Sequence, residues 1–318
     1  MSYRVLVTRE IPEAGLLLLE DFDLTVLSEA PPERDELLEA ANGVDAILST
    51  ATEKIDGELL DAAGSSLKVV ANMAVGYDNI DVPAATERGV VVTNTPGVLD
   101  ETTADVAFML MLAAARRLGE SERVLRAGEW EWWGPKLFMG PDVWGKKLGI
   151  VGMGRIGQAV ARRARGFGME ILYHNRSRKQ EAENELGARY LELDELLETA
   201  DFVSIHTPLT DETRHLIGAS DLQRMKKEAV LVNTSRGPVV DEAALAKALA
   251  EGEIFAAGLD VYEEEPKVHP KLLKLENVVL APHIGSGSIE TRNKMAVLAA
   301  ENLAAVLRGE APKTPVTA

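Results

Sequence analysis

The sequence predicts an α/β protein of two doubly wound parallel-sheet domains, one inserted in the other. Three observations predict this fold. Apolar, strand-like runs alternate with helical segments over about the first hundred residues. A glycine-rich segment at residues 152–157 opens a second alternating series, and a long helical segment follows that series. Because strands that alternate with helices form parallel sheets covered by helices, each series is expected to build one sheet.

The first series supplies the strand candidates and helical stretches of the first domain. The strand candidates are residues 4–8, 24–27, 46–49, 68–71 and 90–93, and the helical stretches lie near residues 12–20, 33–41, 56–63 and 82–88. A longer helical segment then runs from Asp100 to about Ala127, with apolar side chains such as Val106 and Leu110 on one side. A single apolar side indicates a helix that packs against a core.

The second series continues the same pattern and ends in the last helical segment. Its strand candidates are residues 150–151, 170–173, 202–205, 230–233, 256–259 and 278–280. The last helix is expected from about Ser288 to Leu307, because Gly309 and Pro312 follow it as stop signals. We expect this helix to return the chain to the first domain.

Composition excludes several classes of protein. Hydrophobic residues make up 46% of the chain and charged residues 27%, which is ordinary for a globular protein. The chain has no cysteine, so disulfides, thiolate metal sites and thiol catalysis are excluded, and we expect no metal site. The longest apolar run, residues 106–115, is shorter than the roughly 20 residues that cross a bilayer. The first residues enter a strand without a signal peptide, so we expect a cytoplasmic protein.

The formal net charge of −17 argues against a nucleic-acid partner, because such proteins carry a basic surface. The acidity also fits a saline habitat or simple solubility.

Residues 152–157 read Gly-Met-Gly-Arg-Ile-Gly, which is a dinucleotide-binding glycine fingerprint. Gly152 permits the tight turn, Gly154 lets the backbone approach the pyrophosphate, and Gly157 lets the next helix pack closely. A strand precedes the glycines, a helix from about Arg155 to Phe167 follows them, and a second strand begins at the expected distance. The segment therefore predicts a Rossmann domain that holds a pyrophosphate at the helix N-terminus.

The end of that second strand lacks the acid that would bind the ribose of NAD. Asn175, Arg176 and Ser177 stand there instead, followed by Arg178 and Lys179. An acid would repel a 2′-phosphate, whereas guanidinium and hydroxyl groups are natural phosphate ligands. We therefore predict a preference for NADP(H), with NAD(H) as the second cofactor. The alternative is that these cations only form the solvated start of the next helix.

Three polar side chains, Arg236, Glu265 and His283, each follow an apolar strand of the second series. Because ligands bind at the carboxyl ends of parallel strands, we expect these side chains to converge facing the nicotinamide. Arg236 can hold a substrate carboxylate, His283 can give a proton to a carbonyl oxygen, and Glu265 can orient His283. The trio predicts hydride transfer at a 2-oxo acid, with the cofactor carrying the redox chemistry.

Each member of the trio also has a simpler explanation. Arg236 could form a salt bridge at a helix entry, Glu265 lies in an acidic run that could be solvated, and His283 could be a loop histidine. Their joint placement after three strands favours the catalytic interpretation. The other histidines are not expected to be catalytic, although His206 ends a strand that lies near the expected cofactor.

The chain resembles the D-2-hydroxyacid dehydrogenases over nearly its whole length, and among them the glyoxylate/hydroxypyruvate reductases most. The motifs that carry the resemblance stand in the family's order, at residues 72–81, 94–97, 102–105, 151–157, 233–237, 258–266 and 281–286. The resemblance implies NADPH-dependent reduction of glyoxylate and hydroxypyruvate to glycolate and D-glycerate. It supports the roles argued for the trio, and it adds the backbone amides of Val75 and Gly76 as further partners of the substrate, besides Arg236 and His283.

The resemblance also implies which residues contact the cofactor. They are Thr103, Gly152, Met153, Gly154, Arg155, Ile156, Asn175, Arg176, Ser177, Thr207, Pro208, Thr234, Ser235, Asp260 and Gly285. Members of the family that use NAD carry an acid where this chain has Asn175 or Arg176, which agrees with the phosphate argument.

A homodimer is implied as well, built largely on an arm around the long helix. Trp130, Trp132 and Trp133 crowd this arm, and Trp144 lies further on. In related reductases an aromatic side chain from the arm reaches the neighbouring subunit's active site. Here the segment looks shortened, so packing within the dimer interface is an equal alternative.

Together these observations divide the chain into three segments. Residues 1–98 are expected to form the first part of a flavodoxin-like substrate domain. Residues 99–286 are expected to form the NADP-binding Rossmann domain with its dimerisation arm. Residues 287–318 are expected to form the return helix to the substrate domain.

Other functions stay open at this stage. An NAD-dependent enzyme similar to D-3-phosphoglycerate dehydrogenase is the nearest rival, although many of its forms carry a C-terminal regulatory domain and this chain stops at Ala318. Formate dehydrogenase shares the fold with a weaker resemblance. A dinucleotide-sensing corepressor would share it too, but the chain lacks a basic patch and long polar tails.

Overall fold

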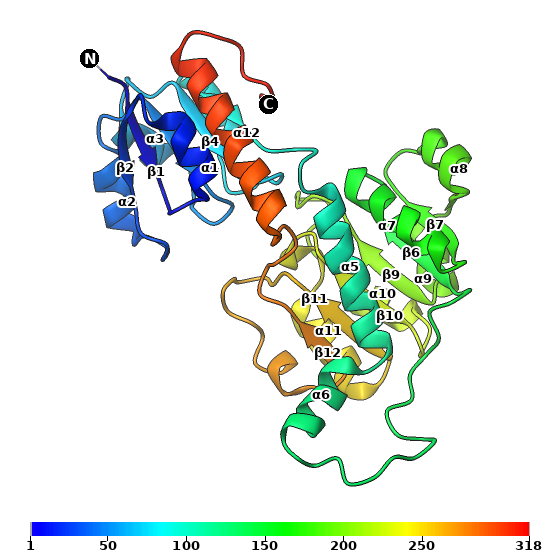
Figure 1. Cartoon of the computed structure of the whole chain (residues 1–318). Helices are drawn as coiled ribbons and strands as arrows, with labels where there is room; N and C mark the ends of the chain where they lie inside the picture. Colours follow the sequence, from blue (N-terminus) through cyan, green and yellow to red (C-terminus); the bar gives the residue numbers. More distant parts are fainter. Residues whose placement is uncertain (1, 318) are drawn as a thin grey trace. The chain divides into compact units, whose positions relative to one another are not determined.

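The computed structural model describes residues 2–317, which divide into two compact units (Figure 1). Unit 1 comprises Met1–Leu99 with Ser286–Ala318, and unit 2 comprises Asp100–Gly285. Each unit holds one sheet, and every strand pairing within these two sheets is parallel. The predicted fold class, two doubly wound α/β domains, is thereby confirmed.

Unit 1 is built on a five-stranded sheet with the order β2-β1-β3-β4-β5. Its strands are β1 (Arg4–Val7), β2 (Asp23–Val26), β3 (Ala46–Ser49), β4 (Val69–Asn72) and β5 (Val91–Thr93). One core contains buried side chains of the sheet and of helices α2 (Arg34–Ala41), α3 (Gly57–Ala63) and α4 (Val82–Glu87). Helix α12 (Ile289–Leu307) packs on β3, β4 and β5. The last helix therefore belongs to the same unit as the first sheet.

Helices α1 (Glu13–Leu16) and α12 lie side by side in unit 1 (Figure 1), with the short 3-10 helix η1 (Leu17–Leu19) against α12 as well. Their close approach depends on Gly15, because a Cβ atom placed there would come 2.8 Å from the Cβ atom of Ala296.

Unit 2 is built on a seven-stranded sheet with the order β12-β11-β10-β9-β6-β7-β8. Its strands are β6 (Lys147–Val151), β7 (Glu170–His174), β8 (Arg189–Tyr190), β9 (Phe202–Ile205), β10 (Val230–Asn233), β11 (Ala256–Leu259) and β12 (Val278–Leu280). β7 and β8 follow β6 toward one edge of the sheet, whereas β10, β11 and β12 follow β9 toward the other edge. The carboxyl ends of β6 and β9 therefore form the switch point at which α/β sheets bind ligands.

Helices cover both faces of this second sheet. Helices α5 (Asp100–Ala115), α7 (Arg155–Gly166) and α8 (Gln180–Leu186) share a core with Ile150, Phe202 and Val232. Helices α9 (Leu193–Thr199), α10 (Ala219–Arg224) and α11 (Glu242–Glu251) share a second core with Val203 and Leu231. Short 3-10 helices η2 (Gly237–Val239) and η3 (Leu272–Lys274) lie in loops that follow β10 and β11. Alternate side chains of each strand therefore enter different cores.

The long helix expected from Asp100 to Ala127 is interrupted, and this is a correction. Helix α5 ends at Ala115 and α6 (Leu118–Arg126) begins after Arg117, whose φ of 52° lies in the left-handed region. The Arg117 guanidinium forms two hydrogen bonds of 2.7 Å with Glu120 and lies over the Phe138 ring. These contacts stabilise the break, and a helical pattern in the sequence cannot show them.

Along residues 2–317, no helix combines the length and the apolar character needed to cross a membrane.

Candidate active site

The predicted trio comes together at the carboxyl edge of the sheet in unit 2. Arg236 follows β10, Glu265 lies in the loop after β11, and His283 follows β12; these three strands are neighbours. The Nδ1 atom of His283 lies 2.7 Å from the Oε2 atom of Glu265. The charge of Arg236 is among the influences that lower the pKa of Glu265. The arrangement therefore places a cation beside an imidazole–carboxylate pair.

Glu265 is held in its ionised form by its surroundings. Burial alone would raise the pKa of this carboxyl, but the hydrogen bond and charge of His283, the backbone N–H of Tyr262 and the charge of Arg236 lower it below its ordinary value. The side chains of His283 and Glu265 are 38% and 25% exposed. An anionic Glu265 orients the ring through Nδ1, so Nε2 is the nitrogen that can exchange a proton with a ligand.

The backbone around His283 is held by Asp260, which directly follows β11. His283 has a φ of 53°, in the left-handed region, and its N–H donates to the Asp260 carbonyl oxygen at 2.9 Å. The buried Asp260 carboxylate accepts hydrogen bonds of 2.7 Å from the N–H groups of Ile284 and Gly285. Burial raises the pKa of Asp260, and these N–H groups and the charge of His283 oppose the rise. Asp260, expected only as a cofactor contact, thus also positions the histidine.

The turn that carries Arg236 is fixed by Asn233, a residue that the sequence did not single out by itself. Its side-chain oxygen accepts from the N–H and hydroxyl of Ser235 at 3.0 and 2.9 Å, and its amide donates to the Arg236 carbonyl at 2.9 Å. A Cβ atom on Gly237 would overlap the backbone of Tyr262. The segment after Arg236 therefore packs directly on the segment before Glu265. The signal that could have identified Asn233 is its place at the end of a strand, directly before Thr-Ser-Arg.

The glycine fingerprint forms the turn that it predicts. Gly152 has a φ of 100°, and a Cβ atom there would come 2.7 Å from the His206 carbonyl carbon. Gly154 precedes the first residue of α7, and a Cβ atom there would meet no atom within 4 Å. The Met153 N–H donates to the Asn175 side-chain oxygen at 3.2 Å, which ties the turn to the end of β7. The backbone at Gly154 is thus open to a ligand at the helix N-terminus.

Buried polar atoms beside this turn support the presence of a cofactor. The hydroxyl oxygens of Thr207, after β9, and Thr234, after β10, are buried and have no hydrogen-bond partner among the described residues. Buried polar groups are nearly always paired, so two such atoms at neighbouring strand ends indicate a ligand that completes them. The residues of the site therefore fit a nicotinamide dinucleotide.

The cations after β7 differ in their surroundings. Arg178 forms an ion pair of 2.6 Å with Glu183 and lies over the Tyr190 ring. Arg176 and Ser177 are exposed, directly after Asn175. Lys179 donates its backbone N–H to the Tyr173 hydroxyl at 2.8 Å. Of the two arginines after Asn175, Arg178 is therefore already engaged by an acid and by an aromatic ring.

The remaining expected contacts lie in both units. In unit 2, buried Thr103 of α5 lies near Gly285, because a Cβ atom on Gly285 would come 3.4 Å from the Thr103 methyl carbon. In unit 1, Val75 and Gly76 lie in the loop after β4. Their carbonyl oxygens accept hydrogen bonds of 2.8 and 2.9 Å from Asn94 and Asn72. These bonds fix the loop whose amides are expected to meet the substrate.

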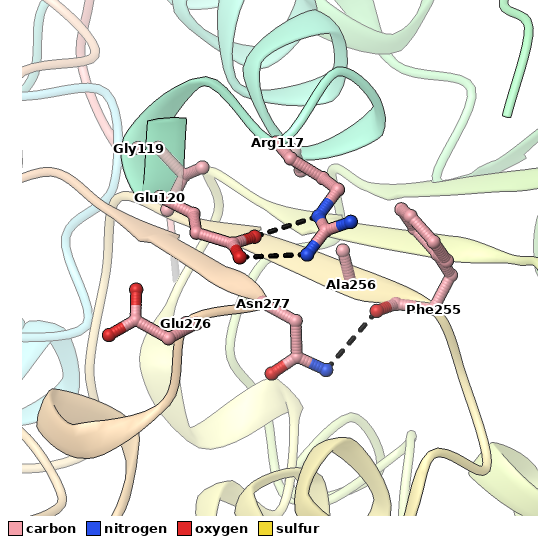
Figure 2. A pocket seen from close by; sticks show the side chains of 9 residues that line it. Arg117, Gly119, Glu120, Phe255, Ala256, Glu276 and Asn277 are labelled. Carbon is pink, nitrogen blue, oxygen red and sulfur yellow. Dashed lines mark hydrogen bonds and ion pairs between the residues drawn. The ribbon is translucent and has the colours of Figure 1, made fainter. Parts of the chain in front are cut away.

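A cavity of about 320 Å³ in unit 2 is not part of this site. Figure 2 shows its lining, which includes Arg117, Glu120, Phe255 and Asn277. Phe255 and Asn277 lie at the amino ends of β11 and β12, the edge opposite the trio. Arg117 is paired with Glu120, and the Asn277 amide donates to the Phe255 carbonyl at 3.2 Å, as the dashed lines show. The side chains of Arg117, Glu120 and Asn277 are thus already engaged in hydrogen bonds within the protein.

Comparison with known proteins gives the site its context. The NAD-binding domain of the D-isomer specific 2-hydroxyacid dehydrogenases matches residues 108–285. The glyoxylate reductase of Korarchaeum cryptofilum is 58% identical over 98% of this chain and 95% of its own. The crystal structure of a glyoxylate reductase from Paecilomyes thermophila has a TM-score of 0.88 and 41% identity, covering 99% of this chain and 98% of its own.

An NADPH-dependent glyoxylate/hydroxypyruvate reductase from Sinorhizobium meliloti, solved with NADP and malonate, is 38% identical with a TM-score of 0.87. That match covers 100% of this chain and 97% of the other.

Proposed function

The chain belongs to the D-isomer specific 2-hydroxyacid dehydrogenase family, and from this premise we propose that it reduces glyoxylate and hydroxypyruvate with NADPH. It is an NAD(P)-dependent 2-hydroxyacid dehydrogenase that acts on small 2-oxo acids. The observation that carries the proposal is the His283–Glu265 pair beside Arg236, at the strand ends that follow the glycine turn.

The proposed mechanism assigns each member of the trio one task. Bound nicotinamide supplies the hydride. Arg236 binds the substrate carboxylate with its planar donor fork and polarises the carbonyl group. His283 gives the proton on Nε2 to the carbonyl oxygen, and Glu265 keeps the ring oriented and stabilises its charged form. The amides of Val75 and Gly76 add donors for the substrate carboxylate.

The proposed preference for NADPH rests on the end of β7. Asn175 or Arg176 stands where members that use NAD carry an acid for the ribose, and the Asn175 amide is already turned to the Met153 N–H and the Ser177 carbonyl. Arg176 and Ser177 offer a guanidinium and a hydroxyl to a 2′-phosphate. The relatives support the choice of substrate: several carry the name glyoxylate reductase, and one solved structure is of an NADPH-dependent enzyme with NADP bound.

The test is a matrix of substrates and cofactors. Values of kcat/KM would be measured for glyoxylate, hydroxypyruvate and 3-phosphohydroxypyruvate, each with NADPH and with NADH. The proposal expects the highest values for one of the first two acids with NADPH. A clear preference for 3-phosphohydroxypyruvate with NADH would favour the phosphoglycerate dehydrogenase alternative and overturn the proposal. Binding of NADPH without turnover of any acid would favour a sensing role.

A further inference from the structure

His206 is a half-buried residue whose imidazole ring the proposed reaction does not use. It directly follows β9, and its Nε2 atom lies 2.8 Å from the hydroxyl oxygen of Ser204, two residues earlier on the same face of the strand. The other ring nitrogen, Nδ1, is buried and lacks a hydrogen-bond partner within residues 2–317. A buried nitrogen left in this state is costly, which indicates a partner that the protein chain does not provide.

The position of His206 indicates which hydrogen-bond partner its Nδ1 atom lacks. Its backbone N–H donates to the Val151 carbonyl at 2.8 Å, and its carbonyl group packs on Gly152 of the glycine turn. The other two unpaired buried atoms in unit 2, the hydroxyls of Thr207 and Thr234, lie at the ends of the neighbouring strands β9 and β10. Three unpaired polar atoms therefore gather at one end of two paired strands, beside the turn that approaches the pyrophosphate.

The hydrogen bond at Nε2 also determines whether Nδ1 donates or accepts a hydrogen bond. The Ser204 hydroxyl can donate to Nε2, and a neutral imidazole that accepts at Nε2 carries its proton on Nδ1. Burial lowers the pKa of His206 to about 3, so the ring is uncharged at neutral pH. His206 then presents one neutral N–H donor, which suits an acceptor oxygen of a phosphate.

We propose that the Nδ1–H group of His206 donates a hydrogen bond to the pyrophosphate of the bound dinucleotide, which makes His206 a cofactor-binding residue. The proposal rests on the dinucleotide being the cofactor, but not on the choice of substrate or on the preference for NADPH. It adds a side-chain donor to the backbone donors of the glycine turn. Because the donor is neutral, its contribution is independent of pH between pH 6 and 8.

The main experiment measures NADPH affinity in the absence of substrate. Dissociation constants would be obtained by calorimetry or nucleotide fluorescence for the wild type, His206→Phe and His206→Asn. Phenylalanine keeps the volume without the donor, so Kd is expected to rise on the order of 10- to 100-fold, as for a hydrogen bond to a charged acceptor. Asparagine can place an amide N–H where Nδ1 stood, so its Kd should stay within a few-fold. His269→Phe is the matched control, because the Nδ1 atom of His269 already accepts the Lys271 N–H and lies outside the proposed site.

A cofactor fragment locates the contact. Adenosine 2′-monophosphate lacks both phosphates of the bridge and the nicotinamide half, so the penalty of His206→Phe should be much smaller for the fragment than for NADPH. An equal penalty for both would place the effect in the adenosine half and overturn the proposal. So would a wild-type Kd for NADPH in His206→Phe.

Two measurements keep the test independent of folding and of turnover. Thermal unfolding without ligand shows whether His206→Phe is folded. If it is not, nitrogen NMR of histidine-labelled wild type decides: a proton on Nδ1 whose signal moves on NADPH addition supports the proposal, and a proton on Nε2 overturns it. Failure of the proposed function would instead appear as lack of reduction by the wild type with normal NADPH binding.

Discussion

His283 shows how the position of the proposed proton donor depends on residues remote from it in the sequence. Its left-handed backbone is unfavourable by on the order of 1–3 kcal/mol for a residue other than glycine. The Asp260 carbonyl and carboxylate hold the backbone at residues 283–285, and Glu265 holds the ring. The position of the imidazole is therefore fixed by three hydrogen bonds to its own loop and one to its ring.

Replacing His283 tests its role as the proton donor. We expect His283→Ala to lower kcat for glyoxylate by about 10²- to 10⁴-fold, the usual contribution of general acid catalysis. The Kd for NADPH should change little, because the proton donor is not needed to hold the cofactor. Steady-state kinetics and a binding titration would be compared on the same preparation. Turnover within a few-fold of the wild type would contradict the assignment.

Arg176 and Arg178 offer a matched pair for the 2′-phosphate. We expect Arg176→Ala to lower kcat/KM for NADPH by about 10- to 100-fold while leaving NADH within a few-fold, because only NADPH carries the phosphate. Arg178→Ala should have a smaller effect on the ratio, since Arg178 is paired with Glu183. The measurement is the ratio of kcat/KM for the two cofactors. Equal ratios in the wild type and Arg176→Ala would show that another group binds the phosphate.

Burial of His206 predicts how stability depends on pH. In the unfolded chain a histidine is protonated below pH about 6.5, whereas the pKa of folded His206 is about 3. The unfolded state therefore binds more protons between these values, so this contribution to stability is complete above pH 6.5 and is lost as pH falls toward 3. The slope from one such group approaches about 1.4 kcal/mol per pH unit.

Urea unfolding of the wild type and His206→Asn, measured from pH 7 to pH 4, checks this expectation. As pH falls, the free energy of unfolding of the wild type should decrease relative to that of His206→Asn, because only the wild type carries the titrating ring. A difference that stays constant with pH would show that His206 binds a proton as readily in the folded protein as in the unfolded chain, which contradicts the lowered pKa.

At the scale of elements, the site depends on loops that pack backbone on backbone. The segment after β10 carries Arg236, and Gly237 lets it lie directly on Tyr262 in the segment that leads to Glu265. The mutual packing of these two segments explains how Arg236 and Glu265, far apart in the chain, come close enough for the charge of Arg236 to act on Glu265.

Gly237→Ala is expected to disturb this packing. The added Cβ atom would overlap the Tyr262 carbonyl, so one loop must shift, at a cost of about 1–3 kcal/mol in the free energy of unfolding. We expect kcat/KM for the oxo acid to fall at least about tenfold, because Arg236 and Glu265 move apart. Gly166→Ala is the control, since a Cβ atom there meets no atom within 4 Å. Equal activity in both variants would contradict the packing argument.

The elements also show what the sequence could predict. Strands such as β9, β10 and β11 have their predicted limits because buried parallel strands are short apolar runs between polar segments. The three residues after β10, β11 and β12 could be predicted to converge because parallel strands share one carboxyl edge. The break at Arg117, the short strand β8 and the support from Asn233 and Asp260 depend on tertiary contacts. No local pattern records such contacts.

At the scale of the whole molecule, the remaining feature is a set of four exposed tryptophan side chains. Trp130, Trp132, Trp133 and Trp144 are 52–76% exposed, in or at the end of the stretch between α6 and β6. Aromatic rings are large apolar surfaces, and a cluster of exposed ones is typical of an interface. A second copy of the chain is the partner that the family resemblance implies.

We therefore expect the protein to sediment as a homodimer, with this stretch in the interface. The double change Trp132→Ser with Trp133→Ser should weaken the dimer at least about tenfold, because burying each ring removes apolar surface worth about 25 cal/mol per Å² from water. Leu273→Ser, at a side chain 63% exposed outside the stretch, should leave the dimer intact. Sedimentation velocity over a range of concentrations measures both. If the double variant stays dimeric but loses kcat, the tryptophans serve an active site rather than the interface alone; a monomeric wild type would contradict the expectation altogether.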